Sequence, residues 1–164
     1  MPSSAFVKIG DIKGNALDQN HKDWVIIDSM SSPIMRTIPQ GAVAQQRVRG
    51  GTTLADVVVT RQLDKSSTKL QEACANGTLF KEVEVHFCTQ LKNKNEPYLI
   101  YKLKDVIVSS YALAAQAGQN APQPVEQISL NYSAVEWTYV DIDEKTGDVR
   151  GQVPAQYDAG ANKA

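Results

Sequence analysis

Apolar and polar residues alternate through most of the second half of the chain. Between residues 82 and 87 the apolar side chains occupy odd positions and the polar ones even positions. Residues 98–111 and 128–140 are rich in the β-branched and aromatic residues typical of strands. Strand follows strand there without intervening helices, which argues against a parallel α/β sheet. The sequence therefore predicts a mainly β fold, an antiparallel β-barrel or β-sandwich.

The alternation changes phase once, between residues 125 and 140. The large apolar residues are first even-numbered, as at Ile128 and Leu130, and then odd-numbered, as at Val135 and Trp137. Because side chains along a strand point alternately to its two faces, a shift by one residue requires a bulge or a sharp bend. We expect this irregularity near residues 133–134, where it would curve the sheet toward a barrel.

One short α-helix is predicted, over residues 66–77. The serines at its start can cap the N-terminus, and Gly77 supplies a C-terminal stop. Apolar residues at helical spacing mark one face: Leu70, Ala73 and Cys74. A helix of about ten residues is only roughly 15 Å long, and such a helix is not stable alone in water. We therefore expect it to pack on the side of the sheet.

The chain has 164 residues, which suits one domain. We expect that domain to span residues 1–158, followed by a flexible tail at 159–164. Lys and Arg number 17 against 18 Asp and Glu, so no basic excess favours nucleic acid as a partner. The apolar runs are too short to insert into a membrane. Residues 1–14 lack the apolar stretch of a signal peptide, so we expect the chain to be made and folded in the cytoplasm.

Residues 31–53 show neither strand nor helix periodicity, and they contain no acidic residue. A connection this long usually has a function or is disordered. Its polar side chains are mainly arginine and glutamine: Arg36, Gln40, Gln45, Gln46, Arg47 and Arg49. Three interpretations stay open: a nucleic-acid contact, a mobile loop, or an arm that becomes ordered against a partner subunit. The first is weakened because no aromatic residue is interleaved for base stacking.

The search for catalytic and metal-binding groups finds only weak candidates. Potential metal ligands share one face of a predicted strand: Glu82, Glu84, His86 and Cys88. Neighbours two residues apart on a strand are separated by about 6.6 Å, too far for one ion without ligands from elsewhere. We interpret them as a solvated outer face, and we expect His21, in a polar turn, to be solvated as well. The sequence predicts no catalytic residue, metal or cofactor.

Four segments together resemble one known family, the Hcp (haemolysin-coregulated) proteins of bacterial type VI secretion systems. They are FVKIGDIKG from residue 6 with His21 and Trp24, LDKSSTKLQEACANG from residue 63, YLIYKLKDVIVSSY from residue 98, and ISLNYSAVEWTYV from residue 128. Any one of these segments alone would be weak evidence. Their combination extends over most of the chain and is specific.

The resemblance implies a β-barrel-like domain with a lateral helix that assembles into hexameric rings. The rings would stack into the inner tube of a contractile apparatus, with sheath, spike and baseplate proteins as partners. Contraction would secrete the tube without a signal peptide, and small effector proteins would bind in the ring lumen. The resemblance implies a structural protein and not an enzyme.

Two groups of residues are predicted to carry this function. We expect the first group to lie at a ring or stacking interface: Arg36, Gln45, Gln46, Arg47 and Arg49. Ser29 and Ser31 are small and polar, and in the family their segment faces the lumen, so we expect them to contact effectors. Two alternatives remain. One is a small metal-dependent enzyme with Glu84, His86 and Cys88 as its site. The other is a monomeric β-sandwich adaptor that binds a partner through the arginine loop.

Overall fold

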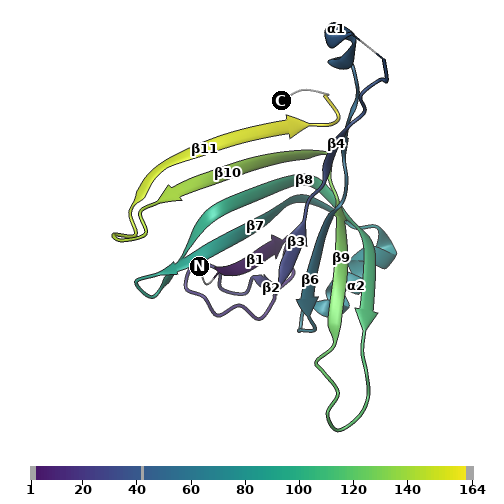
Figure 1. Cartoon of the computed structure of the whole chain (residues 1–164). Coiled ribbons are helices and arrows are strands. Elements are labelled where there is room, and N and C mark those ends of the chain that lie inside the picture. Colours follow the sequence, from purple (N-terminus) through teal and green to yellow (C-terminus); the bar gives the residue numbers. More distant parts are fainter. Residues whose placement is uncertain (1–2, 42, 162–164) are drawn as a thin grey trace.

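The computed structural model describes residues 3–41 and 43–161 (Figure 1). The elements in chain order are β1 (Ser3–Ile9), β2 (Val25–Ile27), β3 (Ser29–Ser31), β4 (Ile34–Arg36), α1 (Ala44–Arg47), β5 (Thr52–Leu54), β6 (Val57–Gln62), α2 (Ser67–Asn76), β7 (Leu79–Leu91), β8 (Lys94–Ala114), β9 (Val125–Asn131), β10 (Ala134–Ile142) and β11 (Val149–Asp158). None of the helices in this described part is long and apolar enough to cross a membrane.

The main sheet is antiparallel, with strand order β2-β1-β7-β8-β9-β6-β3, and β10 and β11 extend it beside β8. Its first and last strands are consecutive in the chain, and the backbone N–H of Asp28 between them donates to the carbonyl of Thr60 at 2.8 Å. The sheet therefore wraps around its core. No ladder among the described strands joins β2 to β3, so the sheet is not closed into a barrel. The predicted mainly β, antiparallel fold is confirmed, with a sandwich as its form.

The predicted helix is confirmed as α2, which lies against the side of the sheet (Figure 1). Leu70 and Ala73 are buried in the main core, and Cys74 is partly buried against it. Gly77 adopts φ +64, the left-handed conformation that ends a helix most easily without a side chain. The N-terminus differs from the expectation because Ser66 makes no side-chain capping bond. A second helix, α1, is a single turn that the sequence did not predict.

The phase change near residue 133 is confirmed as an irregularity between β9 and β10. Both strands pair with β8, β9 with its C-terminal half and β10 with its N-terminal half. The two residues between them leave the ladder, and Ser133 donates from its backbone to the Lys104 carbonyl at 3.0 Å and from its hydroxyl to Asp105 at 3.0 Å. Asp105 itself has φ +51. The chain therefore continues along the same neighbour with its apolar residues in the opposite phase.

Some boundaries differ from the prediction. The run expected over residues 98–111 belongs to one strand of 21 residues, β8, because the preceding turn is confined to Lys92 and Asn93, both with positive φ. Residues 25–31 form two short strands, β2 and β3, that are separated at Asp28. The last strand, β11, lies at an edge of the sheet. A flexible tail was predicted over residues 159–164. Residues 162–164 lie outside the described residues, so the tail stays a prediction.

Candidate assembly interface

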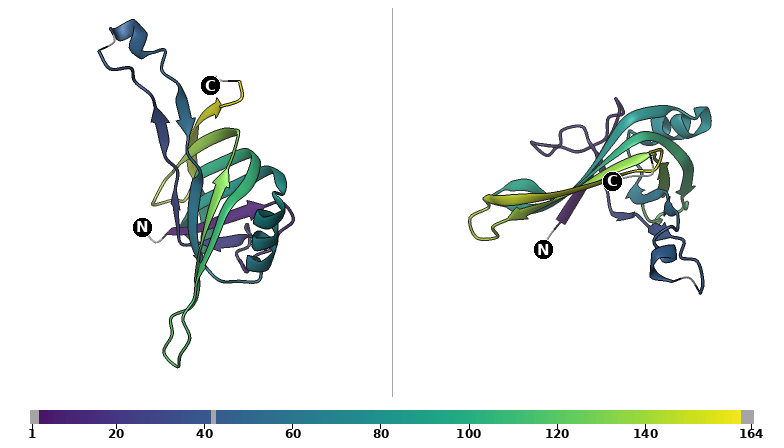
Figure 2. Two further views of the ribbon diagram at one scale, coloured as in Figure 1. Left: turned by 90° about the vertical axis from the view of Figure 1, so that its right-hand side faces the viewer. Right: turned by 90° about the horizontal axis from the view of Figure 1, so that it is seen from above.

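Residues 32–55 form a projecting hairpin, which we call the arm (Figures 1 and 2). β4 pairs with β5 in a separate two-stranded sheet, and α1 lies at the tip. The expectation of an unpatterned loop is therefore wrong for this segment. Its strands are only three residues each, too short to establish an alternation that can be recognised from sequence.

The arm is held together by its own contacts. Arg36 donates to the Thr52 hydroxyl at 3.1 Å and to the Val48 carbonyl. A Cβ at Gly50 would lie 1.6 Å from the Thr37 carbonyl oxygen, so only glycine permits this close approach. Arg36, predicted to lie at an interface, therefore makes hydrogen bonds within its own hairpin. This contact positions the arm, and the predicted role at an interface stays untested.

The arm exposes many apolar side chains for so small an element. Those that are about half exposed or more are Ile34, Met35, Ile38, Val43 and Val48. Gln45, Gln46, Arg47 and Arg49 at the tip are exposed as well. A two-stranded hairpin is at best marginally stable alone, and a contiguous exposed apolar surface marks a place where another molecule binds. These features are typical of an element that packs against another chain.

A second exposed region is the outer hairpin, formed by β10, β11 and the turn between them. Among the described strands β11 pairs with β10 alone, and all of its residues except Tyr157 are exposed. Tyr139 and Val153 are cross-strand partners, and they are 52% and 66% exposed. A ten-residue edge strand of this kind is a ready template for contact with another chain.

Ser29 and Ser31 both lie on β3, at the last position of the sheet order. Both are exposed, and they share a face because they are two residues apart. The Ser29 hydroxyl is hydrogen bonded to that of Thr60 on β6. The structure therefore places both serines at a surface, and their contact with effectors stays a prediction.

His21 is buried, with 1% of its surface exposed, so the expectation of a solvated His21 is wrong. Its ring stacks on Phe6 with centroids 4.5 Å apart and meets Trp24 edge-on at 4.8 Å. Its Nδ1 is 2.5 Å from the Asp18 carboxylate, and its Nε2 is 2.9 Å from Nδ1 of His86. This small aromatic core ties the connection between β1 and β2 to β7.

The prediction that one face of β7 is solvated, the face with Glu84, His86 and Cys88, is partly wrong as well. β7 pairs with β1 in an unbroken register, so Cys88 stays on the same face as His86. The connection between β1 and β2 covers this face, and Cys88 is completely buried there with Phe6, Ala16 and Trp24. Burial above all, with the nearby charges of Asp18 and Glu96, raises the pKa of the Cys88 thiol to about 12, so the thiol is protonated and unreactive. Among the residues described, no group of three or more His, Cys, Asp or Glu side chains is placed to hold a metal ion.

Sequence reasoning missed a buried charged cluster at the start of α2. Arg61 and Glu126 are cross-strand partners on β6 and β9, both completely buried, with Arg61 Nη2 3.2 Å from Glu126 Oε1. Arg61 also donates to the Ser66 hydroxyl at 2.7 Å and pairs with Asp64, and the Ser67 hydroxyl donates to Glu126 at 2.5 Å. The cluster fixes the N-terminus of α2 on the sheet in place of a cap.

A signal for this cluster was present in the alternation. Arg61 continues the inward positions of Val57 and Val59, and Glu126 precedes the inward positions Ile128 and Leu130. Opposite charges at inward positions of two strands predict a buried ion pair once the strands are known to be neighbours. The register, which sequence alone does not provide, was the missing information.

The fold defines the class: a mainly antiparallel β protein with a lateral helix, a projecting arm and an exposed edge strand. These features suit contacts with other chains. The sequence model of the family described as "Type VI secretion system effector, Hcp" matches residues 6–139. The chain therefore belongs to the Hcp family, whose members are structural and secreted proteins of type VI systems.

Individual relatives agree with this assignment. Protein hcp1 of Pseudomonas aeruginosa is 26% identical over 139 residues, which cover 85% of this chain and 84% of that protein. A solved structure described as a type six secretion system protein is similar with a TM-score of 0.89 at 28% identity, over 99% of both chains. The crystal structure of Hcp1 from Salmonella typhimurium has the same fold, with a TM-score of 0.77 at 24% identity over 99% of both chains.

Proposed function

We propose that the chain is a structural subunit of the inner tube of a type VI secretion system, forming hexameric rings that stack and are secreted when the apparatus contracts. The family match over residues 6–139 carries this proposal. It is a proposal for a non-catalytic protein that is folded in the cytoplasm before it is secreted. Its partners are copies of itself, the sheath, spike and baseplate proteins, and small effectors in the lumen, where Ser29 and Ser31 would contact them.

The two exposed elements support an assembly of this kind. A closed ring needs heterologous contacts, in which one surface of a subunit meets a different surface of its neighbour. The outer hairpin and the arm project from different parts of the subunit (Figure 2), so they can serve two separate contacts. We infer that the arm makes the contact between rings or between ring neighbours, with Gln45, Gln46, Arg47 and Arg49 at its tip.

Particle size tests the proposal directly. Light scattering with negative-stain microscopy of the purified chain should show six-membered rings of the 17.9 kDa subunit. A monomer at all concentrations would contradict the proposal and favour an adaptor that binds through the arm. Stoichiometric metal that is lost in His86→Ala would instead favour a metal-dependent enzyme.

The arm gives the first mutational prediction. We expect the double replacement Arg47→Glu with Arg49→Glu to weaken rings or their stacking without unfolding the subunit. Charge-assisted hydrogen bonds contribute about 1.5–3 kcal/mol each when shielded, so the loss of two should lower association by at least about tenfold. Sedimentation velocity, with circular dichroism as the check on folding, measures this effect.

The matched control reverses two exposed lysines outside the arm, Lys8→Glu with Lys22→Glu, and should leave sedimentation unchanged. Intact assemblies of the arm variant at low protein concentration would show that the arm arginines are dispensable. Tight, salt-sensitive DNA binding by the parent chain would favour the nucleic-acid interpretation of this segment.

A further inference from the structure

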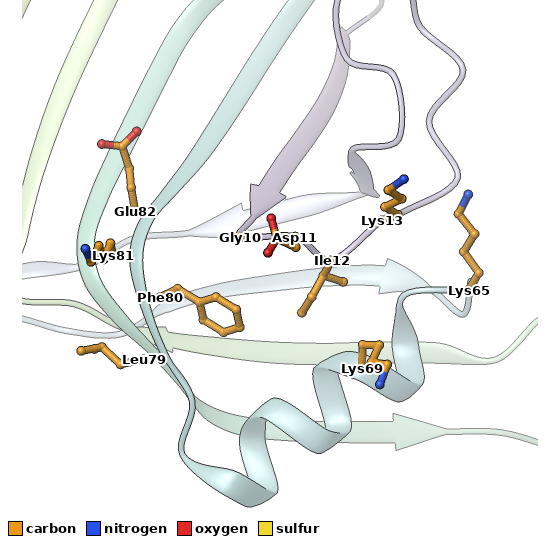
Figure 3. Close-up of a pocket in the computed structure, with 10 residues that line it drawn as sticks. All are labelled: Gly10, Asp11, Ile12, Lys13, Lys65, Lys69, Leu79, Phe80, Lys81 and Glu82. Carbon is orange, nitrogen blue, oxygen red and sulfur yellow. The ribbon is translucent and has the colours of Figure 1, made fainter.

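A cavity of about 820 Å³ lies between α2, the start of β7 and the turn that follows β1 (Figure 3). The floor of the cavity is apolar. In Figure 3, Ile12 and Phe80 lie between Lys65 and Lys69 beside α2 and Lys81 and Glu82 on β7. Leu79, also in the lining, is 58% exposed. Apolar surface of this kind in an open cavity is suited to an apolar side chain of a binding partner.

Gly10 helps to form this floor. It adopts φ +50, and a Cβ built on it would lie 2.8 Å from Cδ1 of Phe80. The absence of a side chain therefore lets the Phe80 ring lie directly against the turn. The cavity is a consequence of how this turn and β7 pack.

The rim of the cavity is basic. Four lysines line it against two carboxylates: Lys13, Lys65, Lys69 and Lys81, with Asp11 and Glu82. Lys65 lies 3.8 Å from Asp23, and Lys69 lies 2.9 Å from Glu72. Both lysines are more than half exposed, so these pairs are weak and leave the lysines available. The partner that fits is therefore an acidic segment that also presents an apolar side chain.

This chain contains such a segment in the turn of the outer hairpin. Residues 141–150 hold four carboxylates against two cations: Asp141, Asp143, Glu144 and Asp148, with Lys145 and Arg150. Val149, next to the last of these acids, is 56% exposed. We call residues 141–150 the acidic turn.

The acidic turn has a defined shape before it meets any partner. The Asp143 carboxylate accepts hydrogen bonds from the backbone N–H groups of Lys145 at 2.8 Å and Thr146 at 3.1 Å, and it pairs with Arg150 at 3.2 Å. Gly147 completes the turn with φ +78. An ordered turn loses little conformational freedom on binding, which favours affinity.

The acidic turn cannot reach the cavity of its own subunit. The turn between β10 and β11 and the helix α2 lie at opposite sides of the molecule in both Figure 1 and the right-hand view of Figure 2. Complementary surfaces at opposite sides of one subunit are the requirement for a heterologous contact that repeats around a ring.

We propose that the lysine-rimmed cavity of one subunit receives the acidic turn of a second copy of this chain. The carboxylates meet the lysines, and Val149 lies against the apolar floor. This inference rests on the proposed function, because it assigns one contact of the proposed assembly. The arm contact is independent of it.

A charge-swap cycle tests the contact. The cavity variant is Lys65→Glu with Lys69→Glu, and the turn variant is Glu144→Lys with Asp148→Lys; Asp143 is kept because it shapes the turn. Each variant places like charges face to face, so each should lower ring assembly by at least about tenfold at low salt. The variant that combines all four changes restores opposite charges and should recover assembly. Analytical ultracentrifugation measures all three beside the parent, with circular dichroism for folding.

The outcomes separate this inference from the proposed function. The control Lys8→Glu with Lys22→Glu, two exposed lysines outside the cavity, should assemble like the parent. If both charge variants form rings as readily as the parent chain, the proposed contact is wrong, whereas the proposed function as a tube subunit still stands. The proposed contact would also be overturned if the variant with all four changes assembled no better than either of the two charge variants. A parent chain that stays monomeric would contradict the proposed function as well.

Discussion

Replacing Arg61 with methionine should lower the free energy of unfolding by about 3–5 kcal/mol, the cost of breaking a buried ion pair by removing one partner. Arg61 and Glu126 are both completely buried and lie opposite each other on β6 and β9. Without Arg61 the Glu126 carboxylate stays in the core, where the Ser67 hydroxyl donates to it at 2.5 Å. The loss is large because an uncompensated charge is left buried.

Urea unfolding followed by circular dichroism at pH 7 measures this effect, at one fixed subunit concentration because assembly contributes to apparent stability. The combined replacement Arg61→Met with Glu126→Leu removes both charges and should recover much of the loss. The matched surface control is Glu72→Gln, which breaks the exposed pair with Lys69 and should cost less than about 1 kcal/mol. A loss for Arg61→Met no larger than that of the control would contradict the assigned role.

The architecture was predictable where local pattern and local chemistry agree. Alternation identified the strands of the second half, and Gly77 ended α2 at the predicted residue. The phase change near Ser133 located the irregularity between β9 and β10 before any pairing was known. Each of these signals depends on residues close together in the sequence.

The parts that were missed depend on contacts between distant residues. Cys88 lies on the predicted face of β7, but the connection between β1 and β2 covers that face and buries Cys88 with Ala16 and Trp24. His21 looked like a turn residue because its partners, Phe6 and His86, come from other strands. The two strands of the arm could not be predicted for another reason. Each has only three residues and does not face the core, so neither shows a periodic pattern. The interface residues within it were predicted from the length of the connection and from the hydrogen-bond donors of its arginines and glutamines, and not from such a pattern.

The buried His86 makes stability depend on pH. His86 is largely buried, with its Nδ1 2.9 Å from Nε2 of His21 and its Nε2 3.5 Å from the Glu84 carboxylate. Burial in the first place, and then the charges of His21 and Lys102, lower the pKa of His86 to about 4. Asp18 faces the other side of His21. Burial acts to raise its pKa, but hydrogen bonds from His21 and Asn95 outweigh that effect, so the pKa of Asp18 lies below its usual value.

We therefore expect the chain to lose stability as the pH falls from about 6.5 to about 4. The unfolded chain binds a proton at His86 near pH 6.5, whereas the folded chain resists it until about pH 4. The stability from neutral His86 is thus complete above pH 6.5 and is lost across this window. We expect a loss of about 2 kcal/mol, smaller than the full shift implies because Glu84 partly compensates the charge. The lowered pKa of Asp18 acts below this window.

Urea midpoints of the parent and of His86→Phe, measured between pH 7.5 and pH 4, test this dependence. Phenylalanine keeps an aromatic ring against Trp24, whose ring lies 4.7 Å from that of His86, but it cannot take up a proton. The variant starts from a lower stability at pH 7.5 because His21 loses its partner, so the comparison concerns the slope with pH and not the starting value. Between pH 6.5 and pH 4 the slope should be clearly shallower in the variant. An equal slope in both proteins would assign the pH dependence to carboxylates elsewhere and contradict the role given to His86.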